Sequence, residues 1–67
     1  MNDGKLIRLI RDAEMYTFSG EYAGAWEEGD IFEYLGESTE PGMIFVRWSA
    51  YGTGDDYMTK RENFTLA

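Results

Sequence analysis

The chain has 67 residues, of which 13 are acidic and 6 are basic, giving a formal net charge of -7. This length holds one domain, which we expect to cover residues 1–67. An aromatic content of 16% excludes a disordered acidic tail, because such tails lack apolar surface to bury. There is no His and no Cys, so the commonest general base and the thiolate nucleophile or metal ligand are both missing.

No apolar run approaches the roughly 18 residues that a transmembrane helix requires. The apolar stretch after Lys5 has no small-residue cleavage site behind it, so it does not resemble a signal peptide. With neither a targeting nor a transmembrane segment, we expect a cytoplasmic protein with no membrane partner. The absence of cysteine excludes disulfides and does not itself indicate a compartment.

The first segment, residues 5–13, allows two interpretations. Leu6, Leu9, Ile10 and Ala13 have helical spacing, whereas the alternation expected of a strand is poor. The rest of the chain is typical of strands and turns, and this context favours a strand. Both interpretations remain open at the level of sequence.

Residues 12–28 are rich in Gly, Ser, Tyr and Ala and show no sustained period. This composition predicts a long irregular loop or a bent hairpin. Gly20 or Gly24 is expected near the tip of such a hairpin, because glycine accepts the positive φ of tight turns.

Four further strands are predicted at residues 31–35, 43–49, 57–59 and 64–66, from β-branched and aromatic residues between turn signals. The intervening turns are expected at residues 27–30, 36–42, 50–56 and 60–63, the last as a polar or 3₁₀ turn. Five short strands with one long early loop predict an all-β fold in the form of a small closed or nearly closed barrel, because an open sheet would leave edges free for pairing.

The predicted core combines about six aromatic side chains, each able to bury about 150–250 Å², with a set of aliphatic residues. The aliphatic members are Leu6, Leu9, Ile31, Leu35, Ile44 and Val46.

The order of these features is similar to the SH3-like barrel. Glu28-Gly29-Asp30-Ile31 matches the acidic turn that introduces the second strand, and Val46-Arg47-Trp48 matches the Trp-bearing strand. Residues 52–55 match the tight hairpin, and Asn63-Phe64 matches the closing pair after a 3₁₀ turn. The resemblance covers residues 5–66. It implies a five-stranded SH3-like small barrel, closest to small bacterial and phage SH3-like proteins without assigned activity.

The chain departs from the groove in which eukaryotic SH3 domains bind polyproline-II peptides. In the first-strand region only Tyr16 could serve, and only Trp48 lies near the position of the required tryptophan pair. No proline occurs between Tyr57 and Phe64. The proline-peptide site is therefore not carried over. A peptide-binding SH3-like module with an altered groove around Tyr16, Trp48 and Tyr57 remains an alternative.

Acidic residues dominate the middle of the chain, since no basic residue occurs between Arg11 and Arg47. Such an interval is typical of a solvated surface that keeps a small protein soluble. It can also form a negative face that steers a basic partner. The nine acids of this interval are Asp12, Glu14, Glu21, Glu27, Glu28, Asp30, Glu33, Glu37 and Glu40.

We therefore expect a non-catalytic binding module that contacts a protein partner, basic or nucleic-acid-binding, through an acidic face containing aromatic residues. Aromatic side chains dominate interface hot spots, although Trp26 could equally cap the bottom of a barrel. The alternative is a phage-type nucleic-acid mimic that inhibits a host DNA- or RNA-binding enzyme. The predicted contact residues are Tyr22, Trp26, Glu27, Glu28 and Asp30.

Direct nucleic-acid binding is disfavoured, because it needs clustered Lys and Arg to neutralise phosphates. Catalysis is disfavoured as well. The acidic pairs Glu27/Glu28, Asp55/Asp56 and Glu33/Glu37 lie in or beside predicted turns, where acidic residues and glycine are favoured for backbone reasons. We expect no cofactor and no metal.

Overall fold

The computed structural model describes residues 5–48 and 54–67, which form a single antiparallel sheet. A 3₁₀ helix, η2, precedes the last strand. Within the described residues there is no α-helix, and hence no helix long and apolar enough to cross a membrane. The all-β prediction is confirmed. The elements are β1 (Leu6–Leu9), β2 (Ala13–Tyr16), β3 (Tyr22–Trp26), β4 (Ile31–Glu37), β5 (Met43–Trp48), β6 (Asp55–Lys60), η2 (Arg61–Asn63) and β7 (Phe64–Leu66).

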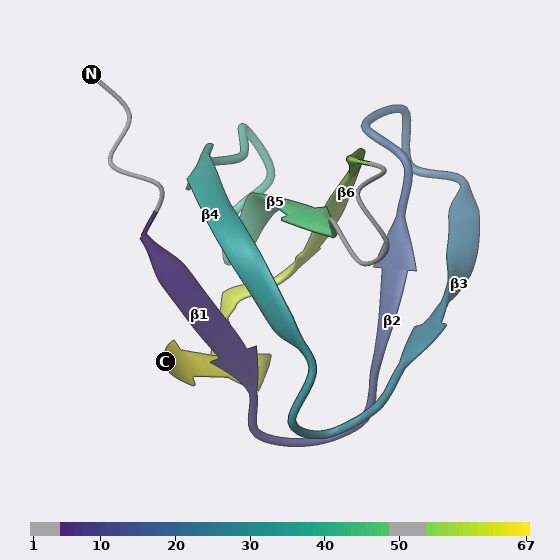
Figure 1. Cartoon of the computed structure of the whole chain (residues 1–67). Coiled ribbons are helices and arrows are strands. Elements are labelled where there is room, and N and C mark those ends of the chain that lie inside the picture. Colours follow the sequence, from purple (N-terminus) through teal and green to yellow (C-terminus); the bar gives the residue numbers. More distant parts are fainter. Residues whose placement is uncertain (1–4, 49–53) are drawn as a thin grey trace.

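The sheet has the strand order β3-β2-β6-β5-β4-β1-β7, and Figure 1 shows that it is strongly curved. Figure 1 shows β1 and β4 on one side and the β2–β3 hairpin on the other, with β5 and β6 joining them. Among the described strands, the end strands β3 and β7 do not pair with each other, so the sheet is open. The five-stranded closed barrel predicted from the sequence is therefore not confirmed.

The two additional strands come from residues 12–28, which contain the β2–β3 hairpin. Its turn is held by the amide of Thr17, which donates to the carbonyl of Glu21 at 2.7 Å. Gly20 has a φ of +96° and lies in this turn, as predicted for the tip, whereas Gly24 lies within β3. The strands are only four and five residues long, and their register shifts between Met15 and Tyr16. A short, bulged hairpin leaves no sustained period in the sequence.

Residues 5–13 do not form a helix. They contain β1 and the first residue of β2, and β1 pairs with β4 on one side and β7 on the other. Ile7 and Leu9 face the core, while Leu6 is 53% exposed, so the prediction of Leu6 in the core is wrong. The prediction of Ile31 in the core is wrong as well, because Ile31 is 41% exposed. In both strands, alternation places every second side chain on the outer face of the sheet.

The core is rich in aromatic side chains, and Phe32 is at its centre. The Phe32 ring lies 5.0 Å from Trp48, 5.6 Å from Phe64 and 6.1 Å from Trp26, measured between ring centroids. The pairs with Phe64 and Trp26 are edge to face and the pair with Trp48 is tilted. Aromatic pairs at such distances stabilise beyond the area that they bury. The buried cluster is Ile7, Leu9, Ala13, Met15, Phe32, Ile44 and Val46, with Trp26, Tyr34, Trp48, Tyr57 and Phe64 packed against it.

The polar or 3₁₀ turn predicted at residues 60–63 is confirmed by η2. Arg11 attaches η2 to the β1–β2 connection, because its guanidinium donates to the carbonyl of Glu62 at 2.8 Å and to Asn63 Oδ1 at 2.9 Å. The predicted turn at residues 50–56 lies partly outside the described residues, and β6 begins within it at Asp55.

Candidate functional site

A concave surface of about 530 Å³ lies on the face of the sheet opposite the core. We call it the outer-face groove. Strand alternation creates it, because Phe45 of β5 and Tyr16 of β2 both pair with Met58 of β6, which places the three side chains on one face. The β2–β3 turn and the β4–β5 turn form its two walls. The lining residues are Tyr16, Phe18, Ser19, Gly20, Ser38, Thr39, Glu40, Pro41, Met43, Phe45, Met58 and Lys60.

Aromatic and thioether groups form the floor of the outer-face groove. The Phe18 ring packs on Phe45 with centroids 4.2 Å apart, yet Phe18 remains 52% exposed. The hydroxyl of Ser38 donates to the sulfur of Met58 at 3.3 Å and so connects the β4–β5 turn to the floor. Flexible thioethers beside rings adapt to varied apolar partners.

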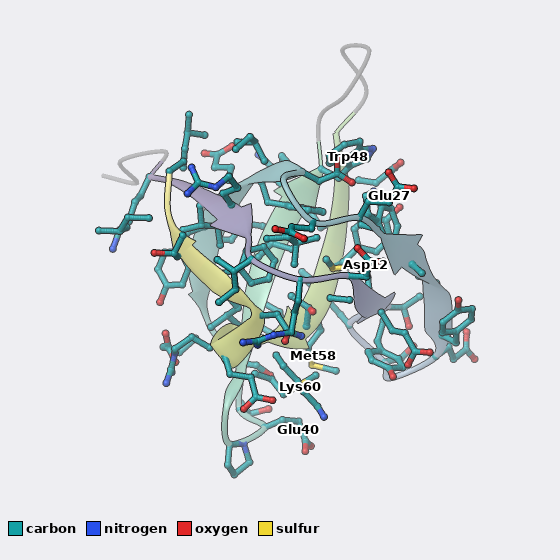
Figure 2. The ribbon with its side chains drawn as sticks, turned by 90° about the horizontal axis from the view of Figure 1, so that it is seen from below. Asp12, Glu27, Glu40, Trp48, Met58 and Lys60 are labelled. Atoms are coloured by element: carbon teal, nitrogen blue, oxygen red, sulfur yellow. The ribbon has the colours of Figure 1, made fainter. Side chains whose placement is uncertain are left out.

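Lys60 lies where the outer-face groove meets two smaller hollows of about 150 and 230 Å³. Figure 2 shows Lys60 close to Met58 and Glu40 at one end of the molecule. Four acidic residues surround this single lysine along the three hollows, which gives the rim a net negative charge. These residues are Asp12, Glu14, Glu40 and Glu62.

Tyr16 is held in place at the rim. Its hydroxyl donates to Glu14 Oε1 at 2.8 Å, and its ring meets Tyr22 edge to face at 6.2 Å. The hydrogen bond to Glu14 is the main reason that the pKa of Tyr16 is raised, and desolvation adds to it. Burial, followed by the charge of Asp55, raises the pKa of Tyr57.

These two shifts predict a loss of stability in alkali. Because the pKa of each tyrosine is higher in the folded chain than in the unfolded one, the stabilisation is complete below the unfolded pKa of about 10. It is lost as the pH rises through the folded pKa. Urea denaturation between pH 8 and 11 should show the free energy of unfolding falling above about pH 10. The double variant Tyr16→Phe/Tyr57→Phe should flatten that fall, and an unchanged slope would contradict the assignment.

A second feature is the acidic turn, which we define as Glu27, Glu28 and Asp30 with the neighbouring Asp12. Asp30 Oδ2 accepts from the amide of Glu27 at 3.0 Å, and Asp12 Oδ1 accepts from the amide of Glu28 at 2.8 Å. Asp12 and Asp30 therefore stabilise the turn, while the Glu27 and Glu28 side chains are exposed. Figure 2 shows Glu40 apart from Asp12 and Glu27, while Asp12 also lines a hollow beside Lys60. The acidic residues therefore extend from the acidic turn toward the rim of the groove.

The five predicted contact residues lie on β3 and the acidic turn, but they do not form one surface. Trp26 is half-buried and packs against the Tyr57 ring at 4.8 Å and the Trp48 ring at 6.1 Å. It thus belongs to the packing around the core, as the capping interpretation expects. Tyr22 is 62% exposed at the other end of β3.

The alternative groove of Tyr16, Trp48 and Tyr57 is not assembled in the described residues. Trp48 and Tyr57 pack with the core, whereas Tyr16 faces the outer-face groove.

The residues that sequence reasoning missed are Phe18, Phe45 and Met58. One signal was available, because residues 43–48 are apolar at nearly every position, which indicates that both faces of that strand are covered or bind something.

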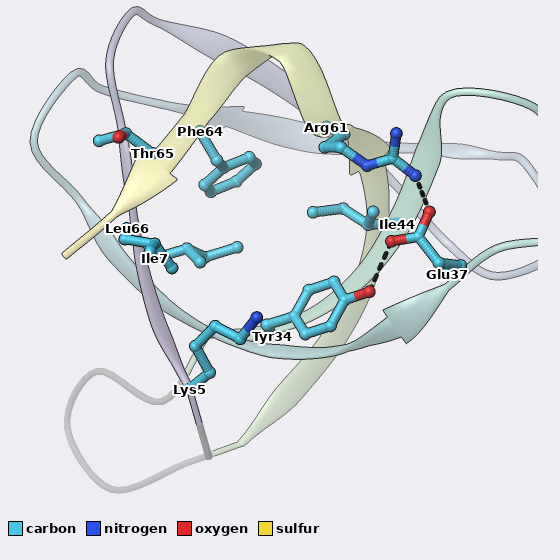
Figure 3. A pocket seen from close by; sticks show the side chains of 9 residues that line it. All are labelled: Lys5, Ile7, Tyr34, Glu37, Ile44, Arg61, Phe64, Thr65 and Leu66. Atoms are coloured by element: carbon cyan, nitrogen blue, oxygen red, sulfur yellow. Dashed lines mark hydrogen bonds and ion pairs between the residues drawn. The ribbon is translucent and has the colours of Figure 1, made fainter. Parts of the chain in front are cut away.

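A separate cavity of about 340 Å³ opens between β1, β4, β5 and β7, and Figure 3 shows its lining. Glu37 occupies its polar side, where it forms an ion pair with Arg61 and accepts from the hydroxyl of Tyr34 at 2.5 Å. The ammonium of Lys5 lies 5.1 Å from the centroid of the Tyr34 ring. We call this the β1–β7 cavity. The lining residues are Lys5, Ile7, Tyr34, Glu37, Ile44, Arg61, Phe64, Thr65 and Leu66.

The described part of the chain contains no group of three or more acidic side chains arranged to hold a metal ion. Comparison with known proteins finds no matching family model, no matching curated protein and no matching solved structure. The two larger concave surfaces, the outer-face groove and the β1–β7 cavity, are therefore the candidate binding sites.

Proposed function

We propose that the chain is a non-catalytic module that binds a segment of a protein partner in the outer-face groove. The exposed Phe18–Phe45 pair beside Met58 carries this proposal. An aromatic ring that is half exposed in a concave surface gains most when a partner covers it, and such rings dominate interface hot spots.

The arrangement of elements supports an SH3-like fold for this module. The β2–β3 hairpin follows the first strand, and a 3₁₀ helix leads into the last strand through the Asn63-Phe64 pair. The strong curvature of the sheet fits a partly open barrel in which β2 and β3 take the place of the long early loop. Binding of an extended peptide in an aromatic groove is in keeping with such a fold.

The charge of the rim favours a basic segment. Glu40 and Glu62 make no side-chain hydrogen bond or ion pair with any described residue, and both line the hollows around Lys60. Apolar side chains of the partner would cover Phe18 and Phe45, while Lys or Arg of the partner would approach Glu40. The net charge of -7 adds a long-range attraction for the same kind of partner.

The two nucleic-acid interpretations have less support. A mimic needs carboxylates along one ridge, whereas Figure 2 shows Glu40 apart from Glu27 and Asp12. Direct binding needs clustered cations, but two of the arginines are paired with carboxylates, Arg47 with Asp56 at 2.8 Å and Arg61 with Glu37. The first observation does not favour a nucleic-acid mimic, and the second does not favour direct binding of a nucleic acid.

Selection of 12-residue peptides from a random library against the intact protein tests the proposal. We expect enrichment of peptides with aromatic or aliphatic residues beside Lys or Arg. Because Phe18 is the most exposed anchor of the groove, Phe18→Ala should weaken binding of a selected peptide about tenfold or more, measured by calorimetry.

Leu6→Ala is the matched control, since it removes an apolar side chain that is as exposed as Phe18 but lies on β1 and does not line the groove. It should bind the same peptide as the wild type does. No enrichment, or equal affinity of the wild type and Phe18→Ala, would refute the assignment of the groove.

A further inference from the structure

The β1–β7 cavity differs in charge from the rest of the molecule. Two of its lining residues are cationic, Lys5 and Arg61, and only one is acidic, Glu37. The cavity therefore carries a local charge of about +1 on a chain whose net charge is -7. Screening limits the opposing field of the distant carboxylates, since the Debye length is about 8 Å at physiological ionic strength.

The floor of the cavity is apolar and reaches the core. Ile7 and Ile44 belong to the buried cluster, and Phe64 packs against it. Figure 3 shows these three side chains pointing into the space, with Lys5 and Arg61 at its margin. A volume of about 340 Å³ lies at the lower end of the range for small-ligand sites, about 300–1,000 Å³.

We propose that the β1–β7 cavity binds a small amphipathic carboxylate. The apolar body of the ligand covers Ile7, Ile44 and Phe64, and its carboxylate lies near the Lys5 ammonium. Among residues 5–48 and 54–67 this ammonium forms no ion pair with a carboxylate, and it lies 5.1 Å from the centroid of the Tyr34 ring. The site is distinct from the outer-face groove, with which it shares no lining residue.

Arg61 and Glu37 adjust the polar end of the site. Their side chains remain 57% and 51% exposed, so their ion pair is weak and its rearrangement around a second carboxylate costs little. Tyr34 donates to Glu37 and keeps that carboxylate on the β4 side of the cavity. The side of the cavity next to Lys5 therefore remains open for the ligand.

Titration of the intact protein with decanoate, decanol and decylammonium, which share one chain length, tests the proposal. In nuclear magnetic resonance spectra, decanoate should shift the signals of Ile7, Ile44 and Phe64 saturably. Decylammonium should bind more weakly, because its charge is opposed by Lys5. Lys5→Gln should lower the affinity for decanoate about three- to fivefold, as expected for a partly exposed charge pair.

Lys60→Gln is the matched control, because it makes the same change at the outer-face groove, and it should leave decanoate affinity unchanged. Three results would each overturn the proposal. They are no saturable binding, shifts centred on Phe45 and Met58 instead of the cavity, and equal affinity for decanoate in the wild type and Lys5→Gln.

Discussion

Phe32→Ala is expected to remove a large share of the free energy of unfolding of the protein. Phe32 is 1% exposed and contacts the rings of Trp26, Trp48 and Phe64. Deleting a buried phenylalanine side chain costs about 3–5 kcal/mol, because transfer free energy is lost and a cavity remains. A domain of this length has a total stability of about 3–10 kcal/mol, at roughly 0.05–0.15 kcal/mol per residue. Urea denaturation followed by tryptophan fluorescence measures the loss.

Phe18→Ala is the matched control for this substitution. It deletes the same atoms from a ring that is 52% exposed and packs on one neighbouring ring, Phe45. Its expected cost is about 1 kcal/mol, within the range for losing one aromatic pair. Equal losses for the two variants would show that Phe32 is not at the centre of the core.

Thr59→Val is expected to detach the β2–β3 hairpin from the rest of the sheet. Thr59 is the buried polar residue of the described chain, with no exposed surface, and its hydroxyl donates to the carbonyl of Glu14 at 3.1 Å. Valine has nearly the same shape and cannot donate, so the Glu14 carbonyl loses its partner. An unsatisfied buried group costs about 1–3 kcal/mol.

The effect should be local as well as global, because the recorded β2–β6 register consists of the single pair Tyr16 and Met58. Hydrogen exchange should accelerate more for the amides of β2 and β3 than for those of β5. Thr59→Ser retains the hydroxyl and should keep most of the hairpin protection. Uniform acceleration across all strands in Thr59→Val would contradict a local role of Thr59 in attaching the hairpin to β6.

This junction connects stability to the proposed binding of a peptide in the outer-face groove. The hairpin supplies Tyr16 and Phe18 to the outer-face groove, while β5 and β6 supply Phe45 and Met58. An element attached by few contacts opens locally at a lower free energy than the core. Variants that weaken the junction should therefore lose peptide affinity before they lose global stability.

Local sequence signals were sufficient for the strands in the second half of the chain. Residues 31–35 and 43–49 combine β-branched and aromatic residues, and turn signals bound them on both sides. The structure places β4 and β5 there, with bounds of Ile31–Glu37 and Met43–Trp48. Strand propensity and turn chemistry act over a few residues, so they can be recognised without knowledge of the partners.

The segment at residues 5–13 and the hairpin depended on distant partners. The first segment has helical spacing, yet it forms a strand because β1 pairs with β4 on one side and with β7 on the other. The extra residues that shift the register lie between Gly24 and Tyr22 and between Tyr34 and Gly36. Each lies beside a glycine with positive φ, which is typical of a bulge but does not by itself reveal the register. A shift of one residue exchanges the two faces of a strand, so it decides which side chains are buried.

The amino-acid sequence by itself therefore determined an all-β chain of acidic character with aromatic side chains in excess. Only the tertiary structure decided which of those side chains line a groove. Phe45 and Val46 are neighbours of similar apolar character, yet Val46 is buried in the core and Phe45 forms the groove floor. The physical reason is that burial depends on which face of the sheet the rest of the chain covers, and that is set by pairing between segments far apart in the sequence.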